Sequence, residues 1–133
     1  MRILLPFALA LPLLVACGGG PQVPPDQLLA ELARARETPV SSGEESATHS
    51  RLVQDVVDAD ALQDLRRFEV EEKIGRGEPC SRHPRCGQLG FQADDWFYPI
   101  GAMGEGYGGP VPLLIVGFDR HGAVDRVWNL RTH

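Results

Sequence analysis

The sequence has little of what several common classes of protein require. Basic residues are fewer than acidic residues, 13 against 18, and the formal net charge is −5. Because a protein that binds a phosphate backbone normally presents a basic stripe, nucleic acid is not an expected partner. The motifs GxSxG and HExxH are absent, as are paired histidines, and these patterns mark several classes of hydrolase. The sequence therefore predicts no enzyme and no bound cofactor.

An apolar run long enough to cross a membrane is lacking as well. The run at residues 3–16 is shorter than the about 20 residues of a bilayer-spanning helix. Pro6 and Pro12 interrupt it further. A basic start, here Arg2, followed by a short apolar region is typical of a cleavable signal peptide. We therefore expect residues 1–16 to direct export and then to be removed.

The end of this segment resembles the bacterial lipobox, in which small residues precede a cysteine that is diacylated before cleavage. Residues 14–17 are Leu-Val-Ala-Cys. The resemblance implies a lipidated Cys17, whose acyl chains would anchor the protein to a membrane. Gly18, in place of an aspartate, implies by the same resemblance the periplasmic face of the outer membrane. The alternative is an ordinary secretory signal followed by a chance cysteine.

Cysteine is scarce, with three in the chain. If Cys17 carries lipid, Cys80 and Cys86 remain as an even pair in an oxidising compartment, which predicts a disulfide. Closing so short a loop stabilises a fold by about 2 kcal/mol in the chain-entropy model. The alternative is a metal site, because His83 lies midway between the two cysteines. A structural zinc site normally needs a fourth ligand, and no second CxxC or HxxxH lies nearby.

The length of 133 residues is enough for one modest domain. Glycines and prolines follow the cysteine and predict a linker at 17–25. We expect a short helix and a polar linker at 26–50. The domain itself is then expected at 51–133.

Helical periodicity occurs in three places. Residues 27–37 are good helix formers with an apolar stripe, and 38–50 are polar and rich in turn formers. Valine and leucine at 52–57 predict a helix that ends near residues 58–60. Apolar spacing over 62–74, ended by Gly75, predicts a further helix. The apolar residues of the last two helices are expected to face a sheet.

Strand signals lie toward the C-terminus. Aromatic or β-branched residues dominate 96–100, 113–118 and 124–130, with glycine, proline and aspartate between them. They predict a three-stranded antiparallel meander, and the fold class is therefore α+β, with two short helices on the sheet. The glycine-rich segment 104–109 leads into prolines and a strand instead of a helix, which excludes a phosphate-binding loop. A hairpin loop with Tyr107 as a contact residue is expected.

These elements together resemble the SmpA/OmlA domain. The resembling features are a helix ending in glycine and then proline at 70–79, Trp96-Phe97-Tyr98, Phe118-Asp119, and Gly122 with Val124. That domain occurs in a small lipoprotein of the outer-membrane β-barrel assembly machine. The resemblance covers about residues 61–130 and implies an envelope protein partner, with the barrel assembly machine as the candidate. The insertion 80–90 and the long loop 101–112 depart from the family pattern, which keeps other partners open.

Other functions stay as alternatives. The chain could be a periplasmic binding or inhibitor module unrelated to barrel assembly, or a small hydrolase or metal-binding protein. Asp119 with His121, and Asp94 with Asp95, are the carboxylate pairs that a hydrolase could use. Turn chemistry explains the first pair, and solvent at the start of a strand explains the second.

The sheet raises the question of what covers its second face. Strand alternation places Trp96, Tyr98 and Ile100 on one face and Phe97 on the other. Two short helices cover one face only. We therefore expect the second face, with Phe97, Leu114 and Val127, to contact a partner protein or the helix at 27–37 folded back. A bulge at Gly122 would exchange the faces of the last strand.

Overall fold

The computed structural model of the chain describes residues 22–130. The predicted signal peptide and the predicted lipidation site Cys17 lie outside these residues. No helix within them is both long and apolar enough to cross a bilayer.

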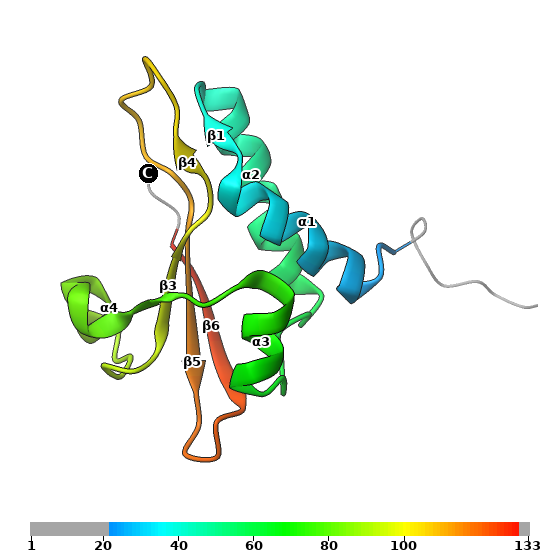
Figure 1. The fold of residues 1–133 in the computed structure, drawn as a ribbon, viewed down its shortest axis with the longest axis vertical. Coiled ribbons are helices and arrows are strands. Elements are labelled where there is room, and N and C mark those ends of the chain that lie inside the picture. The colour runs from blue at the N-terminus through cyan, green and yellow to red at the C-terminus, as the bar shows by residue number, and fades with distance from the viewer. Residues whose placement is uncertain (1–21, 131–133) are drawn as a thin grey trace, which may run out of the picture.

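The described residues form an α+β fold, as the sequence predicts (Figure 1). The helices are α1 (Pro25–Glu37), α2 (Gly43–Asp58), α3 (Arg67–Ile74), the 3-10 turn η1 (Cys80–Arg82) and α4 (Pro84–Gln88). The strands are β1 (Pro39–Val40), β2 (Glu78–Pro79), β3 (Trp96–Pro99), β4 (Ala102–Met103), β5 (Leu113–Phe118) and β6 (Val124–Leu130). The main sheet is antiparallel in the order β2-β3-β5-β6, and β1 and β4 form a separate parallel pair. The predicted meander is therefore present and has a fourth strand, β2, at its edge.

The strand register assigns each side chain to a face. Tyr98 pairs with Leu114, and Phe97 pairs with Ile115, which in turn pairs with Trp128. Paired residues project from the same face of a sheet, and successive residues alternate. Phe97, Ile115 and Trp128 therefore share one face, and Tyr98 and Leu114 share the other.

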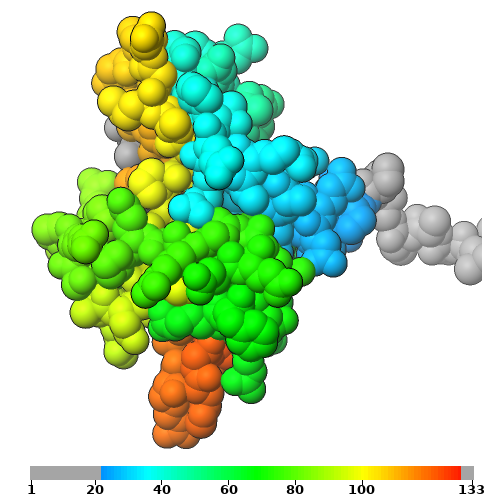
Figure 2. Space-filling model, viewed as in Figure 1, coloured from blue at the N-terminus to red at the C-terminus, as the bar shows by residue number. Residues whose placement is uncertain are grey.

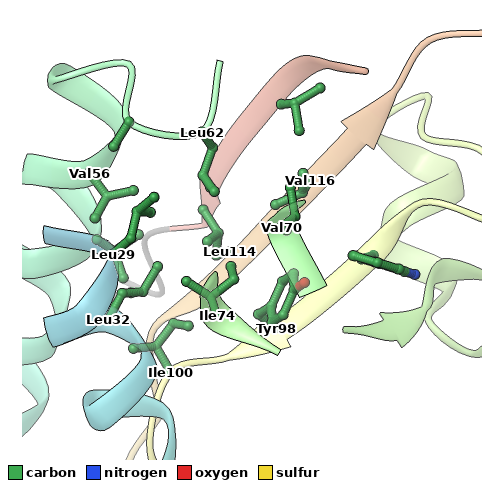
Figure 3. Close-up of a cluster of buried hydrophobic side chains, with 14 of the residues drawn as sticks. Leu29, Leu32, Val56, Leu62, Val70, Ile74, Tyr98, Ile100, Leu114 and Val116 are labelled. Carbon is green, nitrogen blue, oxygen red and sulfur yellow. The ribbon is translucent and has the colours of Figure 1, made fainter. Parts of the chain in front are cut away.

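The face with Tyr98 carries the larger core. Helices α1, α2 and α3 cover it, and their buried side chains point toward those of β3 and β5 (Figure 3). The core includes Leu29, Leu32, Val56, Leu62, Val70, Ile74, Tyr98, Ile100, Leu114 and Val116. The apolar stripe predicted in α1 is buried here and consists of Leu28, Leu29, Leu32 and Ala35. Three helices thus lie on this face of the sheet instead of the two that the sequence predicts, because α1 is part of the core.

Polar groups fasten α1 to the rest of this face. The guanidinium of Arg36 donates to the carbonyl of Ile74 and lies 4.7 Å from the centre of the Tyr98 ring. The Tyr98 hydroxyl donates to the carbonyl of Gly75 over 2.8 Å. Burial raises the pKa of Tyr98, so this hydroxyl keeps its proton. The end of α1, the end of α3 and strand β3 thus meet through side chains.

The segment 38–50 is not a linker, contrary to the sequence prediction. It contains β1, and α2 begins within it at Gly43. The Ser42 hydroxyl accepts from the backbone N–H of Glu45 over 3.2 Å, and the Glu45 carboxylate accepts from Ser41 over 2.6 Å. This is close to a capping box, which starts a helix in a polar sequence. The first turns of α2 are polar because most of their residues face solvent.

The predicted helix at 62–74 is also shorter than expected. Asp60 and Asp64 have φ of 50° and 62°, in the left-handed region that ends helices. The backbone of residues 64 and 65 instead bonds to both polar groups of Val124 in β6. Helix α3 then starts at Arg67. Apolar spacing continues through this break because the loop also contributes Leu62 to the core.

Candidate interaction surface

The three side chains predicted on an open sheet face do not form such a face. Phe97 is 6% exposed and lies on the face opposite the large helices. Leu114 is fully buried under those helices, and Val127 packs against the same core. The prediction that Phe97, Leu114 and Val127 share one face is therefore wrong. It failed because residue alternation within a strand does not fix how neighbouring strands align, and here Phe97 pairs with Ile115.

The second sheet face is covered by the insertion 80–90. Its helix α4 lies across the sheet from α1 and α3 (Figure 1), and Cys80 of η1 joins the small core on this face. A small core forms there from Cys80, Cys86, Phe91, Phe97 and Ile115. Helix α1 is not this cover, since it packs on α2 and α3. The sequence prediction of an uncovered face is wrong at Phe97 and Ile115, which the insertion covers, whereas Trp128 on the same face is 45% exposed.

Side-chain contacts hold this insertion in place. The sulfur atoms of Cys80 and Cys86 lie at disulfide-bonding distance, with Cα atoms 5.5 Å apart. The His83 ring stacks on Phe97 with 3.8 Å between ring centres. Its Nε2 atom is 3.0 Å from the Glu78 carboxylate. His83 therefore serves the packing of the insertion, and among residues 22–130 no group of three or more His, Cys, Asp and Glu is placed to hold a metal ion.

The candidate carboxylates also have local structural partners. Buried Asp95 accepts from the backbone N–H groups of Gln92 and Phe118, at 2.7 and 3.0 Å. Asp94 is solvent-exposed, and its carboxylate is 3.6 Å from Arg67. The two neighbouring carboxylates thus differ in burial and in bonding. The prediction that solvent surrounds both is wrong for Asp95, because its side chain is needed to join the start of β3 to the end of β5.

Asp119 begins the turn between β5 and β6. The backbone N–H groups of Ala123 and His121 donate to its carboxylate, at 3.0 and 2.8 Å. These two bonds hold the pKa of Asp119 below its usual value. The turn chemistry expected for this aspartate is confirmed.

A projecting arm, residues 100–112, lies at the end of the molecule opposite this turn (Figure 2). At its base Ile100 donates a backbone hydrogen bond to Pro112 over 2.8 Å. The backbone of Ala102 and Gly104 donates to Thr38 and Val40, which lie on the β1 side. The arm is therefore fastened both to the sheet and to the segment between α1 and α2.

Helix α2 supports the arm from the same side. Buried His49 places Nδ1 3.0 Å from the carbonyl of Ile100. The Ser46 hydroxyl donates to the carbonyl of Pro110 over 3.0 Å. Gly101 has a φ of 135°, and a Cβ there would collide with Val40. A glycine is thus required where the chain leaves the sheet and enters the arm.

The arm exposes one large apolar side chain, in strand β4 near its base. Met103 is 77% exposed, more than any other large apolar residue described. Tyr107, the predicted contact, is half-buried and donates its hydroxyl to the carbonyl of Pro110 over 3.3 Å. Its ring lies against Gly109, where a Cβ would collide with it. The sequence predicts Tyr107 as the contact residue and not Met103, although Met103 is an apolar residue directly before the glycine-rich loop.

Comparison with known proteins finds no relative of this chain. No family model matches the chain, and no curated protein or solved structure is similar to it at a significant level.

Proposed function

We propose that this protein is a non-catalytic protein-binding module of the bacterial envelope, attached by lipid at Cys17 to the periplasmic face of the outer membrane. The observation that carries the binding role is the arm. It presents Met103 to solvent on a backbone that is hydrogen-bonded to β1 and supported by α2.

An apolar side chain on a fastened backbone suits binding better than one on a mobile loop. An exposed methionine adapts its flexible thioether to an irregular apolar pocket. Because the base of the arm is already fixed by backbone hydrogen bonds, little additional backbone ordering is needed when a partner binds it. The arm is thus a preorganised contact element that offers a single apolar anchor.

The partner we propose is the outer-membrane β-barrel assembly machine. The support is the resemblance of residues 61–130 to the SmpA/OmlA domain, together with an α+β fold that packs helices on an antiparallel meander. The lipobox resemblance supports the lipid attachment at Cys17 and its place on the periplasmic face of the outer membrane. A non-catalytic role is supported by Asp95 and Asp119, whose carboxylates accept backbone hydrogen bonds that hold the fold.

A second candidate is an inhibitor or binding module that acts on a different periplasmic protein. It is favoured by the arm itself, because the loop 101–112 is one of the two segments that depart from the SmpA/OmlA pattern. In this case the same Met103 contact would serve another partner.

The test is capture of partners in mild detergent from cells that express the full chain. Met103→Asp should remove barrel-assembly subunits from the eluate, because a charge cannot enter an apolar pocket without a large desolvation cost. Phe68→Asp is the matched control, since Phe68 is also exposed, at 65%, but lies on α3. It should leave capture unchanged.

Three outcomes separate the candidates. Barrel-assembly subunits that depend on Met103 support the first candidate, and another periplasmic protein with the same dependence supports the second. Equal capture by both variants contradicts the arm as the contact. In parallel, Cys17→Ala should abolish labelling by a palmitate analogue, and unchanged labelling would contradict the lipid anchor.

A further inference from the structure

Strand β6 is an open edge of the main sheet. The opposite edge, β2, has two residues, ends in Pro79 and continues directly into η1. Short, proline-containing edges resist pairing with other chains. Strand β6 is seven residues long and contains neither proline nor glycine. The two edges of this sheet therefore differ in their capacity to accept another strand.

The register shows which backbone groups of β6 face outward. The carbonyl of Pro112 accepts from the backbone N–H of Ile100, and the backbone N–H of Phe118 donates to the Asp95 carboxylate. The even-numbered residues from 112 to 118 therefore direct their backbone groups toward β3. The intervening residues, such as Ile115, consequently bond to β6, where the partner of Ile115 is Trp128. The residues between those partners, Val127 and Asn129, therefore point their backbone N–H and C=O away from the sheet.

The beginning of this edge already holds an added strand. Both backbone groups of Val124 bond to residues 64 and 65, and Arg66 forms an antiparallel bridge with Ala123. From Asp125 onward, no backbone hydrogen bond joins β6 to any described element except β5. The loop before α3 thus pairs with the first residue of β6 and leaves residues 125–130 without a neighbouring strand on their outer side.

A cleft of about 270 Å³ lies beside this unpaired stretch. Val56 and Val57 of α2 form one wall and Val127 of β6 the other. A strand added next to β6 would run about 4.8 Å away and direct every second side chain to the helix-covered face, toward this cleft. The volume is large enough for one or two apolar side chains.

The charge at the cleft is acidic. Asp60 and Asp125 line it together with one basic residue, Arg126. The Arg126 guanidinium is engaged elsewhere, 3.8 Å from the centre of the Phe91 ring and 3.3 Å from the carbonyl of Leu89. Two exposed carboxylates thus face a bound segment, which favours lysine or arginine in it.

The other face of the same edge is apolar. Trp128 is 45% exposed and projects from the face opposite the cleft, beside Ile115. A strand paired with β6 would place its remaining side chains next to this indole, and aromatic cross-strand pairs stabilise sheets. An added segment would therefore find contacts on both of its faces.

We propose that β6 binds an extended segment of a partner protein as a fifth strand of the sheet, and that this segment carries lysine or arginine next to apolar residues. Recognition comes from the outward backbone groups of Val127 and Asn129, from the α2 cleft and from Trp128. The inference goes beyond the proposed function because it uses a surface separate from the arm. The linker at 18–25 contains no basic residue, so it does not match the segment described.

The experiment is selection of random twelve-residue peptides, displayed on phage, against the full chain. We expect enriched peptides with alternating apolar residues and at least one lysine or arginine. N-methylation of successive peptide amides should weaken binding at least tenfold at every second position and leave the others unchanged. That alternation is the signature of a strand with one hydrogen-bonded edge, and it requires no change to the protein.

Protein variants then locate the site. Val127→Pro removes the outward N–H and should weaken peptide binding at least tenfold, whereas Val127→Ile should not. Asp60→Asn combined with Asp125→Asn should weaken binding several-fold at low salt. Met103→Asp should leave peptide binding unchanged, so a failure of the arm and a failure of this site give different results.

Several results would overturn the proposal. The selection could enrich no peptide, or it could enrich acidic peptides. N-methylation could also weaken binding without a two-residue period. A chain dimer that Val127→Pro dissociates in sedimentation would also overturn it, because the edge would then pair with a second copy. If Val127→Pro unfolds the chain, the N-methyl series alone decides.

Discussion

The two faces of the main sheet are covered in different ways. Helices α1, α2 and α3 cover the face with Tyr98, and seventeen buried residues form one core there. Five buried residues form the core on the face with Phe97, under the short elements η1 and α4. The cover over Tyr98 consists of helices with apolar stripes. The cover over Phe97 is a short insertion that individual side-chain contacts hold in place.

The difference shows how the size of a cover determines what stabilises it. A helix of thirteen or sixteen residues presents several apolar side chains from one continuous element. A turn of three residues and a helix of five residues are far too short to be stable in isolation. The small cover therefore depends on the Cys80–Cys86 pair, on His83 stacked on Phe97, and on Arg126 over Phe91.

The largest expected effect is the loss of packing on the helix-covered face. Leu32 in α1 is fully buried, so Leu32→Ala should lower the free energy of unfolding by about 2 to 5 kcal/mol. Urea denaturation of the full chain measures this. Ala30→Ser, at an exposed position of the same helix, should change it by less than about 0.5 kcal/mol. A loss below about 1 kcal/mol for Leu32→Ala would show that α1 contributes little to this cover.

Local patterns in the sequence predicted most of this face. The stripe of α1, the end of α2 and the bounds of β5 and β6 agree with the structure. Each depends on periodicity and turn residues, which act over a few positions. The start of α2 was missed because Ser42 and Glu45 were assigned to a polar linker, although their spacing is that of a capping box.

The second face was not predictable in the same way. Its cover depends on which residues of β3 and β5 pair, and on where the insertion 80–90 packs. Both are set by contacts between residues far apart in the chain. The cysteine pair was inferred from composition, but the stacking of His83 on Phe97 requires the folded arrangement.

The second prediction tests the covalent link of the small cover. Replacing both Cys80 and Cys86 with serine should cost about 2 kcal/mol of stability in the chain-entropy model. Hydrogen exchange should show lost protection at the amides of Leu89 and Phe91, which bond within the insertion. The amide of Val56 in α2 should show a smaller loss, because the helix cover does not depend on this link.

Mass spectrometry of the unreduced protein provides the control for this experiment. Peptides that contain Cys80 and Cys86 should be found linked. Two free thiols in protein recovered from the periplasm would contradict the disulfide. Equal loss of protection on both faces would contradict the independence of the two covers.

The third prediction removes a contact that the small cover makes with the sheet. His83→Ala eliminates the stack on Phe97 and the 3.0 Å contact with Glu78. Aromatic pairs of this kind contribute about 0.5 to 1.5 kcal/mol beyond their buried area, so a loss of about 1 kcal/mol in thermal or urea unfolding is expected. His121→Ala, in an exposed turn, is the matched control and should have little effect. If the two variants have the same stability, the stacking of His83 on Phe97 does not hold the insertion in place.

The smallest effect on stability is expected at the turn between β5 and β6. Asp119 fixes the connection between β5 and β6, and its pKa is lowered by the N–H groups of Ala123 and His121. Because its folded pKa lies below the unfolded value of about 3.9, its contribution is present above that pH and is lost as the pH falls through the folded pKa. Asp119→Asn keeps an acceptor oxygen but removes the charge.

Asp119→Asn should therefore lower stability slightly at pH 7 and less so at about pH 2, because the stabilising charge of the wild type is lost as the pH falls through the folded pKa of Asp119. Asp119→Ala, which also removes the acceptor, should be less stable at both pH values. Urea unfolding from pH 2 to 7 gives both curves, and a constant difference between the wild type and Asp119→Asn would contradict the charge effect. Since β5 contributes to both cores, through Leu114 and Val116 on one face and Ile115 on the other, the amides of Phe91 and Val56 should lose similar protection in Asp119→Ala. A loss confined to one of them would show that the turn belongs to one face, and that the two covers are coupled to the sheet unequally.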